Sequence, residues 1–278
     1  MHPELIHLKL PIVGEFTLYS FGAMMALAFL AGYLVLRSEF RRREQNVELA
    51  SDILLGALVG GIVGAKLYYL ILHFDRTAAD PLGMILSRGG LVWYGGFVGG
   101  VVGSILALRR RRASVALAAD VCAPALALAY GIGRIGCFLV GDDYGRTTGS
   151  WVGVSFPNGI PPSTAGNLRA FGVDVPDAVP DAQVLAVHPT QLYETGLALL
   201  IFLFLWRIRK NRHGPGWLFG VWMMLAGAER LFVEIFRAKD DRFLGTFTLA
   251  QAISVGLILV GFYILHRRAA GRGAEADA

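Results

Sequence analysis

The sequence predicts an all-α, multi-pass membrane protein with seven transmembrane helices. Its 278 residues are 55% hydrophobic and 17% charged, whereas soluble domains carry about 25% charged residues. A soluble protein with this composition would expose large apolar patches. The apolar residues gather in seven runs, each close to the roughly 20 residues that a helix needs to cross the bilayer. The runs lack the alternation of apolar and polar residues that is typical of transmembrane β-strands.

The seven runs define the predicted spans. In chain order they are Phe16–Leu36, Ala50–His73, Leu91–Leu108, Ser114–Val140, Pro189–Trp206, Pro215–Phe236 and Thr248–His266. We expect residues 1–268 to form a single transmembrane domain. Residues 269–278 are expected to be a short disordered tail.

Basic residues predict the orientation of these spans. Of the lysines and arginines between spans and in the tail, 15 fall on one side and 8 on the other. The positive-inside rule then places the N-terminus outside and the C-terminus in the cytoplasm. The one long connection, at about residues 141–187, would lie outside. It is rich in Gly, Pro and Asp and too long for a tight hairpin, so it predicts a small extracytoplasmic cap.

The net charge of +5 and pI of about 9.4 are explained by this orientation signal and by attraction to anionic lipids. We therefore expect no nucleic-acid partner. The two cysteines, Cys122 and Cys137, have neither a metal-binding spacing nor a disulfide framework. No metal and no cofactor are expected.

Glycines recur at four-residue spacing in two neighbouring spans. They are Gly56, Gly60 and Gly64 in the second span and Gly95, Gly99 and Gly103 in the third. Small residues at this spacing let helix backbones approach closely. The pattern predicts a tightly packed helix pair, with room for a lipid headgroup as the alternative.

Ionisable residues inside spans are costly and indicate function. Arg134 lies among glycines near the outer end of the fourth span, either as an ion-pair partner or, as we favour, as the binder of an anionic ligand. Arg230, Glu234 and Arg237 share one helix face in the sixth span. Glu234 would orient the two arginines there; a simple intrahelical salt bridge is the alternative.

The fifth span opens with His188 and Pro189, followed by Gln191 and Glu194, which are three residues apart and point the same way. Pro189 suits a first helical turn, and the helix N-terminus favours anions. Glu194 lies inside the span, where an unpaired carboxylate is costly, so it should pair with an arginine. His188 by itself fits a cap or surface position as well as a catalytic one.

Tyr94 follows Trp93 at the start of the third span. The two residues suit the membrane interface, and the flanking glycines would also let the Tyr94 hydroxyl reach a ligand. The charged residues thus gather near the outer ends of spans four, five and six. Two guanidiniums that converge there suit a phosphate, and a phosphate at this depth indicates a phospholipid.

Four segments resemble the prolipoprotein diacylglyceryl transferase family. The first, G-R-I-G-C-F-L-V-G-D-D-Y-G-R at 133–146, is similar to the family signature G-R-[IV]-G-N-F-x-N-x-E-x-x-G. The others are H-P-T-Q-L-Y-E at 188–194, R-L-F-V-E-I-F-R at 230–237 and the glycine-rich segment at 89–96. The resemblance extends over nearly the whole chain and implies the same seven spans.

The chain departs from the family pattern at four positions. Cys137 and Val140 stand where the signature has Asn, and Asp142 stands where it has Glu. Tyr94 occupies a position where many members carry a histidine that has been proposed as the general base. Phe21 falls where a tyrosine is common. The arginines of the pattern are intact.

The resemblance implies an enzyme of the bacterial inner membrane. Such an enzyme transfers the diacylglyceryl group of phosphatidylglycerol to the lipobox cysteine of a prolipoprotein, forms a thioether and releases glycerol phosphate. This is the first step of lipoprotein maturation. A transporter or flippase for an anionic solute or lipid is the alternative, although the repeats typical of transporters are missing. An intramembrane protease would need a catalytic set that the sequence lacks.

The resemblance also implies roles for particular residues. The expected catalytic residues are Arg134, Arg230, Tyr94 and Glu194. The expected substrate-binding residues are Arg134, Asp142, Gly145, Gln191, His188, Glu234 and Gly95. Arg134 and Arg230 would hold the phosphate, and Asp142 and Glu234 would orient them. Either Glu194 or the lipid phosphate would accept the thiol proton, because a neutral tyrosine with a pKa of about 10 is a poor base.

Overall fold

The computed structural model describes residues 4–10, 14–87, 89–210, 213–238, 242–244 and 247–270. Of the predicted tail at residues 269–278, residues 271–278 lie outside this part of the chain. The described residues are mostly helical. Every predicted span overlaps one long helix.

The long helices are α1 (Ser20–Arg42), α2 (Leu49–Leu72), α5 (Trp93–Arg110), α6 (Val115–Val140), α8 (Thr190–Ile208), α9 (Trp217–Glu234) and α10 (Leu249–Ala270). The short helices are α3 (Phe74–Ala79), α4 (Pro81–Leu86) and α7 (Ala165–Ala170). Helices α3 and α4 lie between α2 and α5, in a connection where no helix was predicted.

Six short strands form antiparallel pairs in the described residues: β1 (Glu4–Leu10) with β2 (Gly14–Tyr19), β3 (Val154–Ser155) with β4 (Ala186–Val187), and β5 (Arg242–Leu244) with β6 (Phe247–Thr248). The predicted start of the first span was wrong by one turn. Phe16 pairs with Leu8 in the first hairpin, so α1 begins only at Ser20. An apolar run does not by itself distinguish the end of a strand from the start of a helix.

Among the described residues, five helices are long and apolar enough to cross a membrane: α1, α2, α6, α8 and α10. The two other long helices have 18 residues each. Glycines and two terminal arginines lower the apolar content of α5, and α9 carries Glu229, Arg230 and Glu234. The protein is thus an all-α, multi-pass membrane protein.

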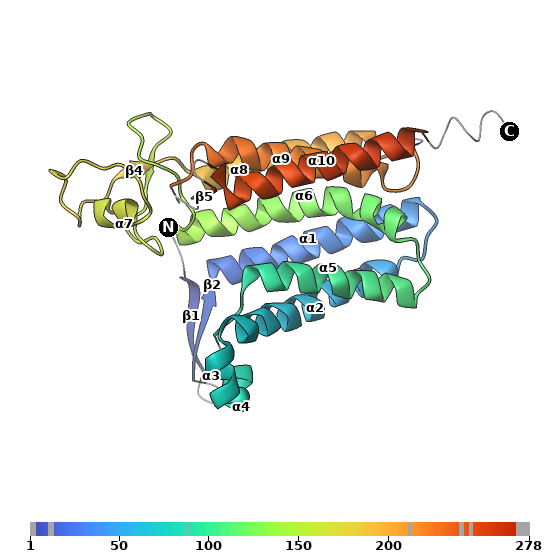
Figure 1. Ribbon diagram of the computed structural model, residues 1–278, viewed down its shortest axis with the longest axis horizontal. Helices are drawn as coiled ribbons and strands as arrows, with labels where there is room; N and C mark the ends of the chain where they lie inside the picture. Colours follow the sequence, from blue (N-terminus) through green and yellow to red (C-terminus); the bar gives the residue numbers. More distant parts are fainter. Residues whose placement is uncertain are drawn as a thin grey trace. The chain divides into compact units, whose positions relative to one another are not determined.

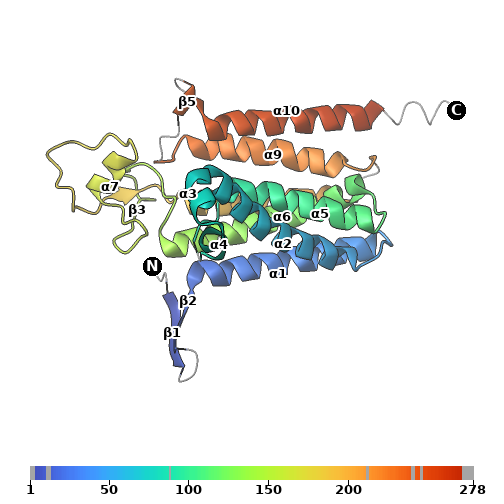
Figure 2. The ribbon, with the colours of Figure 1, turned by 60° about the horizontal axis from the view of Figure 1, so that its bottom comes forward.

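The chain divides into two compact units, residues 33–121 and residues 1–32 with 122–278. In the first unit, α2 and α5 lie side by side (Figures 1 and 2). A Cβ atom added at Gly99 would collide with the main-chain oxygen of Gly60 and lie 2.8 Å from the Cα of Gly64. The glycine spacing therefore produces the close backbone contact that it predicted.

Replacing Gly99 with alanine is expected to destabilise this helix pair. The added methyl group meets main-chain atoms, which cannot move away as a side chain would. Overpacking of this kind costs ~1–3 kcal/mol, which should lower the thermal unfolding midpoint in detergent by about 5 °C. The control is Gly256→Ala on α10, because nothing lies within 4 Å of a Cβ atom there. Equal midpoints for the two variants would contradict the prediction.

In the larger unit, α9 packs on both α8 and α10. A Cβ atom at Gly227 would lie 2.6 Å from the main-chain oxygen of Ser254, so this glycine brings α9 and α10 together. Leu205 and Leu218 are fully buried in a core shared by α6, α8 and α9. These contacts fix the three helices that carry most of the predicted site.

Residues 141–187 form a small folded cap in the same unit. Phe156 and Leu168 are fully buried in its own apolar core. Figures 1 and 2 show the cap, with β3, β4 and α7, beyond the C-terminal end of α6. The cap is tied to the helix ends because the Gly145 amide donates to the His188 oxygen at 2.8 Å and the Arg146 amide donates to the Phe236 oxygen at 2.8 Å.

Candidate active site

Glu194 on α8 lies at the centre of a cluster of charged side chains. It is fully buried and forms an ion pair with Arg134 of α6. Its Oε1 atom accepts hydrogen bonds from Arg230 of α9, at 3.3 Å, and from the hydroxyl of Tyr130, at 3.0 Å. One carboxylate therefore joins two guanidiniums from different helices. This is the arginine pairing that the buried position of Glu194 predicted.

The packing of α6 against α8 explains how these groups meet. A Cβ atom added at Gly131 would lie 3.2 Å from the Cβ of Ala198, so a larger residue would push the helices apart. The Thr195 hydroxyl donates to the main-chain oxygen of Gly131 at 3.2 Å. Arg134 follows Gly131 by one turn, and Glu194 precedes Thr195. Close packing at the glycine therefore places the guanidinium and the carboxylate together.

Glu234 contacts both Arg230 and Arg237, but only Arg230 lies with it on a helix. Because α9 ends at Glu234 and Arg237 pairs with Gly145 in an isolated β-bridge, the predicted shared helix face was wrong for Arg237. Its Oε2 atom lies 3.1 Å from Arg230 Nη2 and 3.6 Å from Arg237 Nε. Its Oε1 atom accepts a hydrogen bond from the Thr248 hydroxyl at 3.0 Å. Glu234 is buried, so it links both arginines to the start of α10.

Asp143 connects the cap to the arginines. Its Oδ2 atom accepts from Arg134 Nη1 at 3.1 Å, and its Oδ1 atom accepts from Arg237 Nη2 at 3.2 Å. The Asp143 side chain is 42% exposed. Its partial desolvation would raise the pKa of the carboxyl, but the charges of Arg237 and Arg134 outweigh this and hold the pKa below its usual value. Asp143 therefore stays ionised at neutral pH.

Asp142 was expected to orient Arg134, but it is the neighbouring Asp143 that accepts a hydrogen bond from Arg134. A role of Asp142 in substrate binding stays a prediction. Asp143 adopts a left-handed backbone conformation with φ of 55°, and this turn brings its own side chain to the arginines. Burial, and then the adjacent charge of Asp143, raise the pKa of the Asp142 carboxyl. Arg134 Nη1 also donates to Cys137 Sγ at 3.3 Å.

Gln191 and Thr190 secure the loop that carries these aspartates. Gln191 is fully buried, and its Nε2 atom donates to the main-chain oxygen of Asp142. The Thr190 hydroxyl donates to the main-chain oxygen of Asp143 at 2.7 Å. The first turn of α8 thus fixes the loop after α6, while the Gln191 Oε1 atom has no partner among the described residues.

His188 and Gly145 lie at the junction of the cap with α8 and α9. His188 Nδ1 and the Tyr193 hydroxyl are 3.0 Å apart. A Cβ atom at Gly145 would collide with the Phe236 oxygen and lie 2.8 Å from the His188 Cβ. The structure thus gives Gly145 a packing role. Substrate binding by these two residues stays a prediction.

Tyr94 and Gly95 belong to the unit of residues 33–121. Tyr94 is exposed, and its ring meets that of Trp93 edge to face with centroids 5.2 Å apart. A Cβ atom at Gly95 would collide with the main-chain oxygen of Gly64. Gly95 thus serves the contact between α2 and α5. The roles of both residues in the site stay predictions.

Four residues of the cluster were not predicted: Tyr130, Asp143, Glu229 and Thr248. Tyr130 precedes Arg134 by one helical turn and could have been found from that spacing. Asp143 and Glu229 are direct neighbours of predicted residues. Nothing near Thr248 in the sequence indicates its contact with Glu234.

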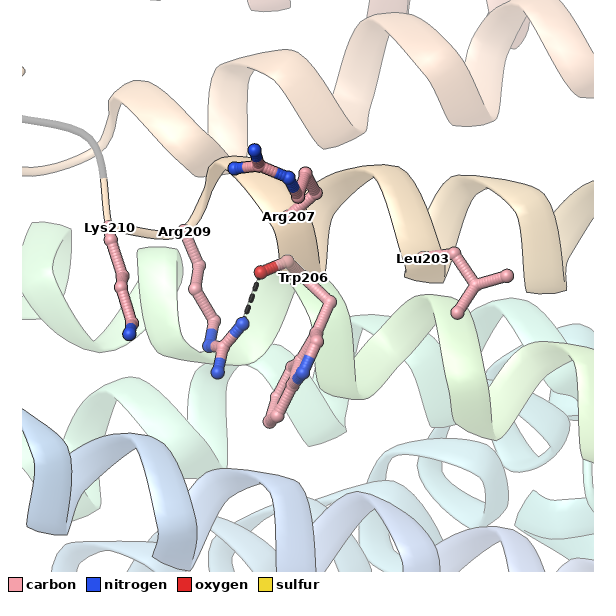
Figure 3. Close-up of a pocket in the computed structure, with 5 residues that line it drawn as sticks. All are labelled: Leu203, Trp206, Arg207, Arg209 and Lys210. Atoms are coloured by element: carbon pink, nitrogen blue, oxygen red, sulfur yellow. Dashed lines mark hydrogen bonds between the residues drawn. The ribbon is translucent and has the colours of Figure 1, made fainter.

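The opposite end of α8 has a different character. Figure 3 shows Arg209 there with its guanidinium beside the ring of Trp206, 3.6 Å from the ring centre, and hydrogen-bonded to the Trp206 main-chain oxygen. Arg207 and Lys210 line the same hollow. Thirteen residues of helix separate Arg207 from Glu194, about 20 Å. Carboxylates are absent from this hollow's lining, so it differs chemically from the Glu194 cluster.

The cluster around Glu194 can bind an anion at a partly buried position. Arg230 keeps 26% of its side chain exposed, and Arg134 Nε has no partner among the described residues. Both guanidiniums therefore have donors to offer. Planar guanidiniums bind phosphate through two parallel hydrogen bonds.

Comparisons with known proteins agree on one family. A family model described as prolipoprotein diacylglyceryl transferase matches residues 8–267. Phosphatidylglycerol–prolipoprotein diacylglyceryl transferase of Clostridium tetani is 30% identical over 90% of this chain and 92% of its own length. Phosphatidylglycerol–prolipoprotein diacylglyceryl transferase 2 of Clostridium perfringens is 30% identical over 90% of this chain and 90% of its own length. The Chlorobaculum tepidum relative is 30% identical, over 88% of this chain and 84% of its own.

Proposed function

Because the chain belongs to the prolipoprotein diacylglyceryl transferase family, we propose that it transfers the diacylglyceryl group of phosphatidylglycerol to the lipobox cysteine of prolipoproteins. The products are a thioether-linked lipid and glycerol phosphate. The observation that carries this proposal is the Glu194 bridge, which holds Arg134 and Arg230 together at one end of three helices. Two adjacent guanidiniums suit the phosphate of a phospholipid headgroup.

The reaction is a displacement at a saturated carbon. The cysteine sulfur forms a bond to a glyceryl carbon, and the bond from that carbon to the phosphate oxygen breaks. The electron pair leaves with glycerol phosphate, so negative charge grows on that oxygen. Arg134 and Arg230 bind the phosphate and stabilise this charge. Fixed donors in a site of low water content are effective because they need no rearrangement during the reaction.

Glu194 acts on this reaction through the arginines. Its carboxylate already contacts Tyr130, Arg134 and Arg230, so it positions the two guanidiniums and does not receive the thiol proton. Glu234 positions Arg230 from the other side. Without these carboxylates, two like charges would face each other in the membrane.

The proposal includes the topology. All seven long helices span the inner membrane of a bacterium, with the N-terminus and the cap outside and the C-terminus in the cytoplasm. The basic residues at the end of α8, Arg207, Arg209 and Lys210, support this orientation under the positive-inside rule. The cap and the arginine cluster then lie on the side where secreted preproteins emerge.

An assay with defined components tests the function. Purified protein is mixed with phosphatidylglycerol vesicles and a peptide that carries a lipobox cysteine. Glycerol phosphate release and a lipidated peptide are expected together, and both should be missing with phosphatidylcholine or with a Cys→Ser peptide. Movement of phosphatidylglycerol between leaflets without glycerol phosphate release would support a flippase instead.

Replacing Asp143 with asparagine is expected to lower kcat about tenfold, because Arg134 loses one of its two carboxylate contacts and small misplacements of a binding group are costly. Glu194 still holds Arg134, so activity is not abolished. The assay above measures the effect, and exposed Asp177→Asn in the cap is the matched control. An unchanged kcat in Asp143→Asn would remove Asp143 from the positioning of Arg134.

A further inference from the structure

Glu229 on α9 is a buried acid for which the reaction described above has no use. Its exposed fraction is 8%, and its Oε1 atom has no hydrogen-bond partner among the described residues. Leaving a carboxylate oxygen buried without a donor is costly. A site of this kind needs an explanation, such as a partner that arrives with the substrate.

The geometry of α9 directs Glu229 toward the cluster. Gly227 contacts Ser254 of α10, and two residues advance a helix by about 200°. Glu229 therefore lies on the face of α9 turned away from α10. Val233, one turn later on that face, is fully buried. The carboxylate interacts electrostatically with Glu194 and with both Arg230 and Arg134.

Glu229 differs from the other carboxylates of the cluster. Glu194, Glu234 and Asp143 each form ion pairs with two arginines. Among the described residues, Glu229 forms no such pair within 4.0 Å, so its oxygen keeps a lone pair free to receive a proton. A carboxylate oxygen that has no ion-pair partner and lies near the phosphate-binding arginines is able to serve as a general base.

We propose that Glu229 is the general base that takes the proton from the lipobox cysteine. The inference rests on the proposed function and adds a catalytic residue to it. The S–H proton moves to the Glu229 carboxylate as the sulfur–carbon bond forms and the carbon–oxygen bond breaks. Glycerol phosphate leaves with the electron pair. Glu229 then returns the proton to water, so the enzyme ends the cycle unchanged.

The pH dependence of Glu229→Gln tests this role. At pH 7 we expect kcat to fall about 100-fold, the size of a general-base contribution. The loss should shrink as the pH rises toward the thiol pKa of about 8.5, because the thiolate then forms without help. KM for phosphatidylglycerol should change less than twofold, since the arginines remain. Glu229→Asp keeps a carboxylate and should retain more activity than Glu229→Gln.

Three results would overturn the inference while leaving the function intact. The first is a wild-type kcat for Glu229→Gln at pH 7. The second is a fall in kcat that stays the same size as the pH rises, and the third is an activity loss that comes from a higher KM. Exposed Glu48→Gln is the matched control for the change of side chain. If Glu229→Gln does not fold, Glu229→Met takes its place because it removes the acid and keeps a side chain of similar length; wild-type kcat at pH 7 in that variant would reject the base. A wild-type protein that releases no glycerol phosphate would instead reject the proposed function.

Discussion

Turnover should be abolished, with a loss of about 1,000-fold or greater, when Arg134 or Arg230 is replaced with lysine. Both arginines contact carboxylates through separate nitrogens: Arg134 meets Glu194 and Asp143, and Arg230 meets Glu194 and Glu234. A lysine has a single ammonium group and cannot keep these contacts while it also binds a phosphate in two places. Because lysine keeps the positive charge, the variant tests whether the two parallel hydrogen bonds of the guanidinium are needed.

Glycerol phosphate release over a range of phosphatidylglycerol concentrations measures the effect. Arg207→Lys, at the other end of α8, makes the same substitution outside the cluster and should keep full activity. Comparable unfolding midpoints for the variants and the control would show that the loss is catalytic. Lipidation at the normal rate in either Arg134→Lys or Arg230→Lys would reject the assignment of these arginines to the phosphate.

Replacing Glu194 with glutamine should be the most destabilising single change in the cluster. The amide keeps the size of the side chain and one oxygen for Tyr130, but it cannot neutralise Arg134 and Arg230. Removing one partner of a buried ion pair costs about 3–5 kcal/mol because the remaining charges are uncompensated. We expect the unfolding midpoint in detergent to fall by about 10 °C and activity to be lost with it.

A second substitution separates lost charge balance from lost packing. In Glu194→Gln/Arg230→Gln, one of the unpaired positive charges is also removed. The loss in free energy of unfolding in this double variant should be ~1–3 kcal/mol smaller than the sum of the losses in the two single variants. Exposed Glu48→Gln serves as the control. Additive effects would mean that Glu194 and Arg230 do not stabilise one another.

Apolar runs predicted the helices well because membrane helices need a minimum length of apolar sequence. The run at Ala50–His73 became α2 within one residue at each end. The first run was less reliable, since its opening residues pair with β1. Hairpin pairing is a contact between segments, and a single run of residues carries little information about it.

Which residues bring charge into the apolar spans could be predicted from the sequence alone, because the position of an ionisable residue within an apolar run is a local property. Arg134, Glu194 and Arg230 were identified in this way. Which carboxylate contacts which guanidinium follows from the tertiary structure: Asp143, and not Asp142, hydrogen-bonds to Arg134, and Glu229 forms no ion pair within the part of the chain that the structure describes. Such pairings depend on loop conformation and helix rotation, which contacts between distant segments fix.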